Sequence, residues 1–258
     1  MNPTLRNAAF FVSIAFFVLT AGLRADDSIP AGTIIPVMLN STLSSAKCKP
    51  GQIITARVMQ DIPLWSGPSI HAGAKVIGHI VSVTPAANGA PASISFRFDT
   101  LKTSKGKIPI ATHLRAIASF VEVDQAQIPI MGADRGTPPE AWTTVQIGGD
   151  AVYRGGGPVV GLEGKVGRPV SNGVLGRLYA NPDRGCSGAI NASESPQALW
   201  VFSGDACGAY GLPNLTVRHA GRTDPVGQIS LESKKGQVNV NAGAGILLRV
   251  NATDVSGV

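Results

Sequence analysis

The histidines come first in a search for chemistry, because a neutral imidazole binds metals and transfers protons near neutral pH. The chain has four: His71, His79, His113 and His219. His71 and His79 fall in one expected strand region, but no acidic residue or cysteine completes a set of three or four ligands with them. We therefore expect surface or turn histidines, no metal site and no cofactor.

Carboxylate pairs are the next candidates, since hydrolysis of cell-wall or polysaccharide bonds uses two Asp or Glu side chains in one cleft. In the second half of the chain, Asp150, Asp205 and Asp224 could form such a pair. Asp99-Thr100-Leu101 has leucine where an aspartic protease has glycine, and a second copy is missing. No Gly-x-Ser-x-Gly motif surrounds a serine. We predict no catalytic residues, with a hydrolase using these aspartates as an alternative.

Three polar or aromatic residues near the last third of the chain could form a shallow sugar-binding surface: Trp200, Tyr210 and Asn214. The same Trp200 stands beside Val201 and Phe202 in an apolar run. A tryptophan in that setting is more often packed in a core, where its large surface is removed from water. We favour core packing and keep the binding surface as the alternative.

The cysteines indicate the redox compartment. Three cysteines in an exported chain predict one disulfide and one free thiol. Cys186 and Cys207 are both flanked by glycines and close a short loop, so we predict that they pair and that Cys48 stays free. A catalytic thiol is the alternative, but no histidine or asparagine stands in a recognisable nucleophile setting.

The first 25 residues have the parts of a secretory signal peptide: Arg6, an apolar run from Ala8 to Leu23, and Ala25 before two aspartates. We expect cleavage after Ala25. The alternative is an uncleaved anchor, for which the apolar run is barely long enough. If the signal peptide is cleaved, we expect the mature protein to have no integral membrane segment and to be periplasmic or secreted.

The charge of the chain argues against a nucleic-acid partner. The net charge is +6, and loss of Arg6 and Arg24 leaves 20 basic and 16 acidic residues, a net of +4. A nucleic-acid binder concentrates Lys and Arg on one face with interleaved aromatic residues. Here the basic residues are scattered; Lys102, Lys105 and Lys107 surround one expected turn. We interpret these lysines as solvated turn residues.

Strands must position any of these residues, because the chain is rich in Gly and Pro and has no long helical periodicity after residue 25. Ile54, Ala56 and Val58 alternate with polar residues, as a half-buried strand requires. A cadence of Ala-Gly followed by apolar, largely β-branched residues occurs three times, at Ala31-Gly32, Ala72-Gly73 and Ala242-Gly243. Because glycine readily takes a positive φ, the cadence predicts a turn followed by a strand.

Several segments of the second half have local signatures. Residues 131–140 read as a linker, and the triple glycine 155–157 reads as a turned loop because no helix follows to hold a phosphate. Asn172-Gly173 predicts a type I′ hairpin turn. Residues 226–232 and 237–241 predict a second hairpin, and residues 196–203 a strand. The apolar run 116–124 predicts a further strand of the first module.

Taken together, the pattern predicts an all-β protein with a barrel-like module at residues 28–125 and a second β-rich part at 130–258, stapled by the disulfide. The last strand, 245–250, begins like the first strand of the chain. We therefore expect it to return to the first module, which would make the middle of the chain an insertion into one barrel.

The first module resembles a known family. The segments that carry the resemblance are 30–37, 43–45, 51–62, 70–78, 92–101 and 106–110. Over residues 29–115 they are similar to the conjugal-transfer (TrbI-like) β-barrel of type IV secretion channel proteins and to related uncharacterised bacterial envelope domains. The resemblance implies a β-barrel in a bacterial envelope protein. The chain lacks the family's long Pro-rich linker and its cytoplasmic-plus-anchor N-terminus, so we expect a free-standing relative.

The function expected from the sequence is that of a non-enzymatic envelope protein, secreted or periplasmic, which binds a protein partner or a surface polymer through edge strands and loops. One alternative is a component of a secretion or conjugation channel, which would form rings. The other is the cell-wall or polysaccharide hydrolase considered above.

Overall fold

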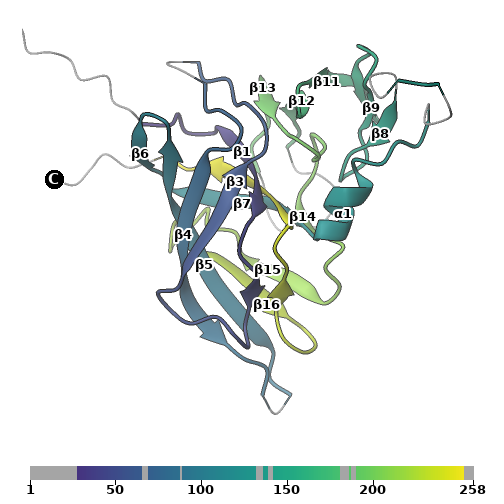
Figure 1. Ribbon diagram of the computed structural model, residues 1–258. Coiled ribbons are helices and arrows are strands. Elements are labelled where there is room, and N and C mark those ends of the chain that lie inside the picture. The colour runs from purple at the N-terminus through teal and green to yellow at the C-terminus, as the bar shows by residue number, and fades with distance from the viewer. Residues whose placement is uncertain are drawn as a thin grey trace, which may run out of the picture.

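The structure is a computed structural model that describes residues 28–65, 69–87, 89–131, 136–138, 142–180, 186 and 190–252. Their regular secondary structure is almost all β-strand, with one short helix (Figure 1). The expected all-β fold class is confirmed. The expected signal peptide and most of the expected linker at 131–140 lie outside the described residues. No helix within the described ranges is long and apolar enough to cross a membrane.

The larger of the sheets has ten strands and is barrel-like. Its order is β14-β7-β18-β1-β3-β4-β5-β16-β15, with β6 paired to β5, and the end strands β14 and β15 approach each other so that the sheet nearly closes. All pairs are antiparallel except β14 with β7. The strands are β1 (Ile34–Leu39), β3 (Ile53–Val58), β4 (Lys75–Thr84), β5 (Ala92–Thr103), β6 (Gly106–Pro109), β7 (Thr112–Ala118), β14 (Gly208–Tyr210), β15 (Leu215–His219), β16 (Ile229–Ser233) and β18 (Gly245–Val250).

A second, six-stranded antiparallel sheet lies beside the barrel (Figure 1). Each of its strands pairs with the strands next to it in the chain, so the sheet is a meander. They are β8 (Thr143–Val145), β9 (Ala151–Tyr153), β10 (Val159–Gly161), β11 (Gly164–Val170), β12 (Gly173–Leu178) and β13 (Ser193–Ala198). The chain leaves the barrel after β7, builds this sheet and re-enters the barrel at β14, so the sheet is an insertion between two barrel strands. A small pair of strands, β2 (Leu43–Ser44) and β17 (Asn239–Val240), completes the structure.

The division of the chain at residues 125–130 therefore marks the exit from the barrel and not a boundary between two consecutive sheets. The strands after residue 207 belong to the barrel sheet or pair beside it. The returning last strand is present as expected: β18 lies between β1 and β7, with Ile34 opposite Arg249 and Leu247 opposite Ala116. Side chains on both faces of β18 are buried, since Ile246 and Leu248 face the barrel core while Leu247 packs against the inserted sheet. This double burial explains the unbroken apolar run in its sequence.

The repeated Ala-Gly cadence forms the same turn each time. Gly32, Gly73 and Gly243 have φ values of 84°, 87° and 89°, directly before β1, β4 and β18. In each turn the amide one residue after the glycine donates to the carbonyl three residues earlier, at 3.2 Å. A positive φ at the third position is the mark of a type II turn, which favours glycine there. The Ala-Gly cadence therefore marks a type II turn followed by a strand.

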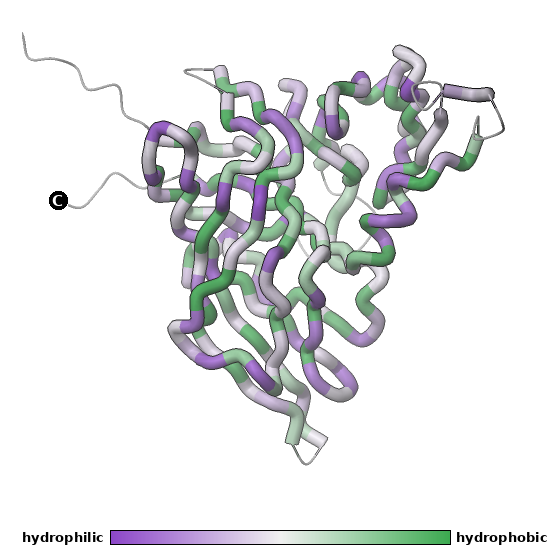
Figure 2. Tube along the Cα trace, in the orientation of Figure 1, coloured by the Kyte–Doolittle hydropathy of each residue, from purple (hydrophilic) through white to green (hydrophobic). Residues whose placement is uncertain are grey.

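The barrel core follows the expected alternation. Ile54, Ala56 and Val58 of β3 are buried between more exposed neighbours. Figure 2 shows hydrophobic and hydrophilic residues alternating along the barrel strands. Phe96 and Phe98 pack edge to face inside, with ring centroids 5.8 Å apart. Burial of such side chains stabilises the fold by about 25 cal/mol for each Å² of apolar surface removed from water. This is the main stabilising contribution for a sheet of this kind.

The expected strand at 116–124 is only partly correct. β7 ends at Ala118, and α1 (Phe120–Gln125) follows. Ser119 is the N-cap of α1, and its hydroxyl accepts a hydrogen bond from the Glu122 amide. A serine with a glutamate three residues later is the sequence signature of a capping box, which favours a helix start even within a β-branched run. Here only the serine half forms, since the Ser119 amide donates to the Tyr210 carbonyl. The sequence carries this signal, and the apolar pattern obscured it.

Three further predictions need correction. The turn after β11 contains Ser171 and Asn172, and only Asn172 has a positive φ (61°), so it is not a type I′ turn. The expected strand 196–203 ends at Ala198, because Trp200 takes a positive φ of 51° in a turn. The expected hairpin 226–241 does not form: β16 pairs with β5 and β15, whereas β17 pairs with β2. The local alternation predicted that these two strands pair with each other, but both pair with other strands.

Candidate binding groove

The disulfide pairing is as expected. Cys186 and Cys207 form the bond, and Cys48 is buried and free. Cys207 stands directly before β14, where the chain re-enters the barrel. The bond therefore ties the loop after β12 to the point of re-entry. The Cys48 thiol lies among backbone groups of its own turn, and the Ser44 amide donates to its sulfur at 3.3 Å.

Two of the three candidate aspartates lie close together. Asp150 is buried, and its Oδ2 accepts a hydrogen bond from the Gly204 amide at 2.7 Å. Asp205 accepts from the Ser203 hydroxyl at 2.5 Å. Burial raises the pKa of Asp150, the Gly204 hydrogen bond opposes that shift, and the nearby Asp205 carboxylate adds to it. Asp224 is elsewhere, in the loop beside His219.

The contacts of Asp150 indicate a structural role. Its carboxylate is directed at a backbone amide of the turn after Phe202, and the side chain is only 4% exposed. A general acid or base must reach a substrate atom within hydrogen-bond distance. Asp150 instead satisfies a buried donor that would otherwise have no partner, which is the usual reason for a buried polar side chain.

The suggested sugar-binding residues have different settings. Trp200 is buried, packs edge to face against Phe202 with centroids 6.4 Å apart, and belongs to the core between the barrel and the inserted sheet. The Tyr210 hydroxyl accepts a hydrogen bond from the Cys207 amide at 3.0 Å. Asn214 is exposed with a positive φ of 67° in the turn before β15. Core packing thus describes Trp200, although one part of it borders the groove described below.

The histidines are distributed over the barrel. His79 pairs with Asp99 at 2.9 Å on the outside, and His71 lies 3.7 Å from Asp61. His219 contacts the Gln228 carbonyl at 2.7 Å. Burial lowers the pKa of His113 to about 4, although the hydrogen bond that its ring donates to the side-chain oxygen of Asn251 acts in the other direction. In the parts of the chain that the structure describes, no group of three or more His, Cys, Asp or Glu residues is placed to bind a metal ion.

An open groove of about 1000 Å³ lies where the barrel meets the inserted sheet. The end of β3 and the turn before β4 form one wall. The other wall is formed by β8, the residues after β9 and the turn between β11 and β12. The lining residues are Arg57, Val58, Met59, Ala72, Gly73, Gln127, Trp142, Thr144, Arg154, Gly156, Pro169, Val170, Ser171, Asn172, Gly173, Trp200 and Val201.

Both charged residues of this lining are arginines. Arg57 is exposed at the end of β3. Arg154 is partly buried, donates to the Gly173 carbonyl at 3.1 Å and to the Thr144 hydroxyl at 3.5 Å, and has its pKa lowered by burial. Trp142, half-buried, donates from its indole nitrogen to the Thr137 carbonyl at 3.2 Å. The groove therefore offers positive charge, aromatic surface and polar turn atoms.

Buried polar side chains fix the groove walls. The Gln60 side chain, fully buried, accepts hydrogen bonds from the amides of Val174 and Trp200 and donates to the Val174 carbonyl. Arg115 on β7 donates to the carbonyls of Tyr179 and Gly204 at 2.8 and 3.0 Å. Burial lowers its pKa to about 10, so it stays charged at neutral pH. The barrel and the inserted sheet are joined by directional bonds and not only by apolar contact.

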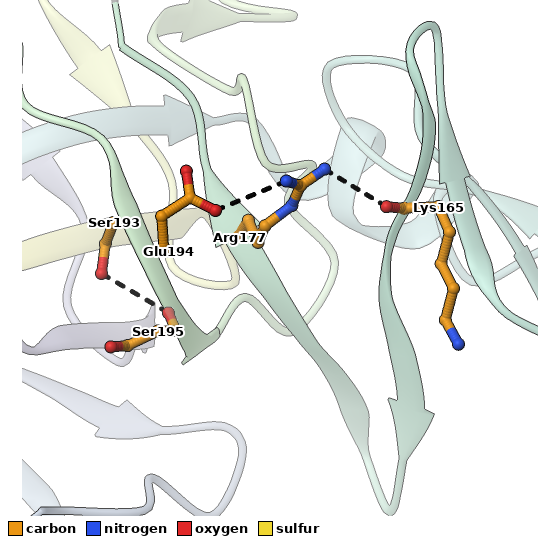
Figure 3. A network of polar contacts seen from close by, with 5 residues as sticks. All are labelled: Lys165, Arg177, Ser193, Glu194 and Ser195. Atoms are coloured by element: carbon orange, nitrogen blue, oxygen red, sulfur yellow. Dashed lines mark hydrogen bonds and ion pairs between the residues drawn. The ribbon is translucent and has the colours of Figure 1, made fainter.

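A more exposed polar network crosses three strands of the inserted sheet (Figure 3). Arg177 on β12 pairs with Glu194 at 3.4 Å and donates to the Lys165 carbonyl at 3.3 Å. The Glu194 side chain is 82% exposed. An exposed pair of this kind contributes little stability, because water and salt screen it. In Figure 3 the Lys165 side chain points away from the network, and this residue is exposed.

Sequence reasoning did not find the groove. Arg57, Trp142 and Arg154 are far apart in the chain and belong to no motif, and the pairing that brings them together depends on the insertion. The triple glycine was the one local signal, since Gly156 takes a φ of 91° and lines the groove. The chain matches no protein-family model, and no curated protein matches it.

Proposed function

We propose that this is a non-enzymatic protein of the bacterial cell envelope, periplasmic or secreted, that binds a protein partner in the groove between the barrel and the inserted sheet. The observation that carries the proposal is the groove itself: an open space of about 1000 Å³ in which both charged lining residues are arginines. The disulfide supports an oxidising compartment, where such bonds persist.

The lining supports binding in preference to chemistry. Among the described residues that line the groove there is no Asp, Glu, His or Cys. General acid–base and nucleophilic catalysis depend largely on those side chains, so the groove lacks the usual reactive groups. The rest of the lining is mostly apolar or contributed by turns, and a concave, mostly apolar surface with a few polar groups is typical of a binding site.

The arginines define what kind of segment would fit. A guanidinium group forms paired hydrogen bonds with a carboxylate, and these are stronger than hydrogen bonds between neutral groups. Trp142 supplies an aromatic surface near Arg154, and tryptophan and arginine are frequent centres of binding energy at interfaces. The partner would present an exposed segment with an acidic side chain beside an apolar one.

The test is capture of the partner from the envelope fraction of the producing cell by the mature, oxidised protein. Ser171→Trp places a large side chain in the groove from an exposed turn position, whereas Leu162→Trp makes a similar change in a fully exposed turn at the other end of β11. We expect the captured protein to be lost with Ser171→Trp and kept with Leu162→Trp.

The captured protein is then purified and titrated against both variants. Binding should weaken about tenfold or more for Ser171→Trp, and it should weaken with added salt because charge pairing at an open groove is screened. Equal binding to both variants, or binding that does not respond to salt, would exclude the groove as the acidic-segment site.

A further inference from the structure

Four basic residues form a straight row across the outside of the barrel. Strand pairing places Arg57 of β3 opposite Lys75 of β4, Lys75 opposite Lys102 of β5, and Lys102 opposite Lys107 of β6. Directly paired residues of neighbouring strands point to the same face of a sheet. All four residues are exposed, while their neighbours Val58, Val76 and Leu101 are buried in the barrel. We call these four residues the basic row.

The basic row is an unusual arrangement because like charges directly opposite one another destabilise a sheet. Neighbouring strands are about 4.8 Å apart, so the four charges repeat over roughly 15 Å. Within the described parts of the chain, no hydrogen bond or ion pair joins any of these four side chains to another residue. Asp99, the acidic residue of β5, already forms hydrogen bonds with His79 and with the Thr100 hydroxyl.

An external anion would relieve this repulsion. We propose that the basic row binds a linear anionic polysaccharide, a chain with an acidic group on each sugar, laid across strands β3, β4, β5 and β6. A chain with an acidic group on each sugar presents a continuous line of negative charge that can run along the four basic residues. Lysine ammonium groups are compact charges on flexible stems, and they can follow such a chain without a fixed bidentate geometry.

The neighbouring surface favours a polysaccharide over a nucleic acid. The next paired positions on this face are Thr55, Ile77, Thr100 and Pro109, and none of them is aromatic. Proteins that bind single strands stack bases on aromatic side chains, and readers of duplexes insert a helix or ribbon into a groove. A sheet face with an even row of charges has neither feature.

This inference goes beyond the proposed function and does not depend on what the groove binds. Only Arg57 lies in both surfaces, so tests of the basic row use the lysines and leave Arg57 unchanged. The variant Lys75→Gln with Lys102→Gln removes the two central charges. Its matched control, Lys234→Gln with Lys235→Gln, removes two exposed lysines from the turn after β16.

The experiment measures binding of the mature protein to polygalacturonate by calorimetry, with neutral dextran as the reference polymer. We expect the wild type to bind polygalacturonate and not dextran, with affinity that falls as salt rises. The Lys75/Lys102 variant should bind about tenfold or more weakly, whereas the Lys234/Lys235 control should stay within about twofold. The central variant should fold normally, because it removes repulsion, and thermal melting checks this.

Three results would overturn the proposal. They are no binding of polygalacturonate by the wild type, equal binding by the central variant, or lysine-dependent binding of a thymidine oligonucleotide that is as tight as that of the polysaccharide. Capture of the groove partner by the central variant is measured in parallel. If that capture persists while polysaccharide binding is lost, the two surfaces act separately.

Discussion

The side-chain amide of Gln60 hydrogen-bonds with both backbone polar groups of Val174, donating to the carbonyl at 2.8 Å and accepting from the amide at 3.1 Å. Gln60 follows the last residues of β3 in the barrel, and Val174 lies in β12 of the inserted sheet. The same oxygen of Gln60 accepts from the Trp200 amide at 2.8 Å. One side chain thus substitutes for a strand pairing between two sheets, and it sets the distance between the groove walls.

Gln60→Leu should therefore destabilise the protein severely. Leucine keeps the volume but leaves the amides of Val174 and Trp200 and the Val174 carbonyl without partners, at a cost of about 2–4 kcal/mol. Urea denaturation measures the loss. The matched control is Gln52→Leu, at an exposed site where the amide makes a local bond with Lys49, and it should change stability by less than about 0.5 kcal/mol. Equal effects of the two variants would contradict this role of Gln60.

Gly173 should also prove intolerant of alanine. A Cβ at this position would clash with the Gln60 side chain and with the Trp200 Cα, and the φ of Gly173 is not positive, so the requirement is close approach and not turn geometry. We expect Gly173→Ala to cost about 1–3 kcal/mol in urea denaturation. Gly51→Ala is not a suitable control, because the φ of 80° at Gly51 would add backbone strain. The test is the double variant Gly173→Ala with Gln60→Ala, in which part of the lost stability should be recovered. Additive losses in that pair would rule out the clash.

Asp150 gives a pair of variants with opposite outcomes. Asp150→Asn keeps an oxygen that accepts from Gly204 and removes a charge that burial disfavours, so stability at neutral pH should be unchanged or higher. Asp150→Ala leaves the Gly204 amide unpaired and should cost about 1–3 kcal/mol. Because the folded pKa of Asp150 is raised, this residue makes the protein more stable as pH falls through that pKa toward its ordinary value of 3.8. Denaturation of both variants near pH 7 and near pH 4 tests the assignment.

His113 should make the protein less stable in mild acid. Its pKa is lowered from 6.5 to about 4 by burial, so the unfolded chain takes up a proton at a higher pH than the folded protein does. The contribution is fully present above pH 6.5 and is lost as pH falls from 6.5 to about 4, by about 3 kcal/mol in all. The difference in unfolding free energy between wild type and His113→Gln, followed across that window, should show this slope. A difference that does not vary with pH would contradict it.

The disulfide should matter for stability and not for the shape of the barrel. Loss of the bond between Cys186 and Cys207 should cost about 3 kcal/mol, from freer motion of the unfolded chain. The double variant Cys186→Ser, Cys207→Ser should melt at a lower temperature than wild type, and wild type in excess reductant should match it. A variant that melts as the oxidised wild type does would show that the bond is not a structural staple.

The features that sequence predicted well are those set by a few adjacent residues. The glycine turns at Gly32, Gly73 and Gly243 follow from glycine's freedom at positive φ, and the alternation of β3 follows from the pleat. The pairing of Cys186 with Cys207 required only proximity in the chain. The returning strand β18 could be inferred because it repeats the start of β1.

The features that sequence missed depend on register between distant strands. Lys102 and Lys107 do flank a turn, as expected, but their pairing with Lys75 and Arg57 can be known only once the sheet is formed. The groove likewise needs Arg57 and Arg154 to be placed by separate sheets. Trp200 was expected in a strand, but it lies in a turn in which its amide donates to the distant Gln60 side chain, a contact that no local pattern records.

Photo-crosslinking in the envelope of the producing cell shows directly whether a partner binds in the groove. A benzoylphenylalanine replaces Ser171 in the groove or, in a matched strain, Leu162, which is exposed roughly 20 Å away at the other end of β11. We expect a covalent adduct with one defined protein from position 171 and none from position 162. An adduct from position 162 with none from position 171 would contradict it.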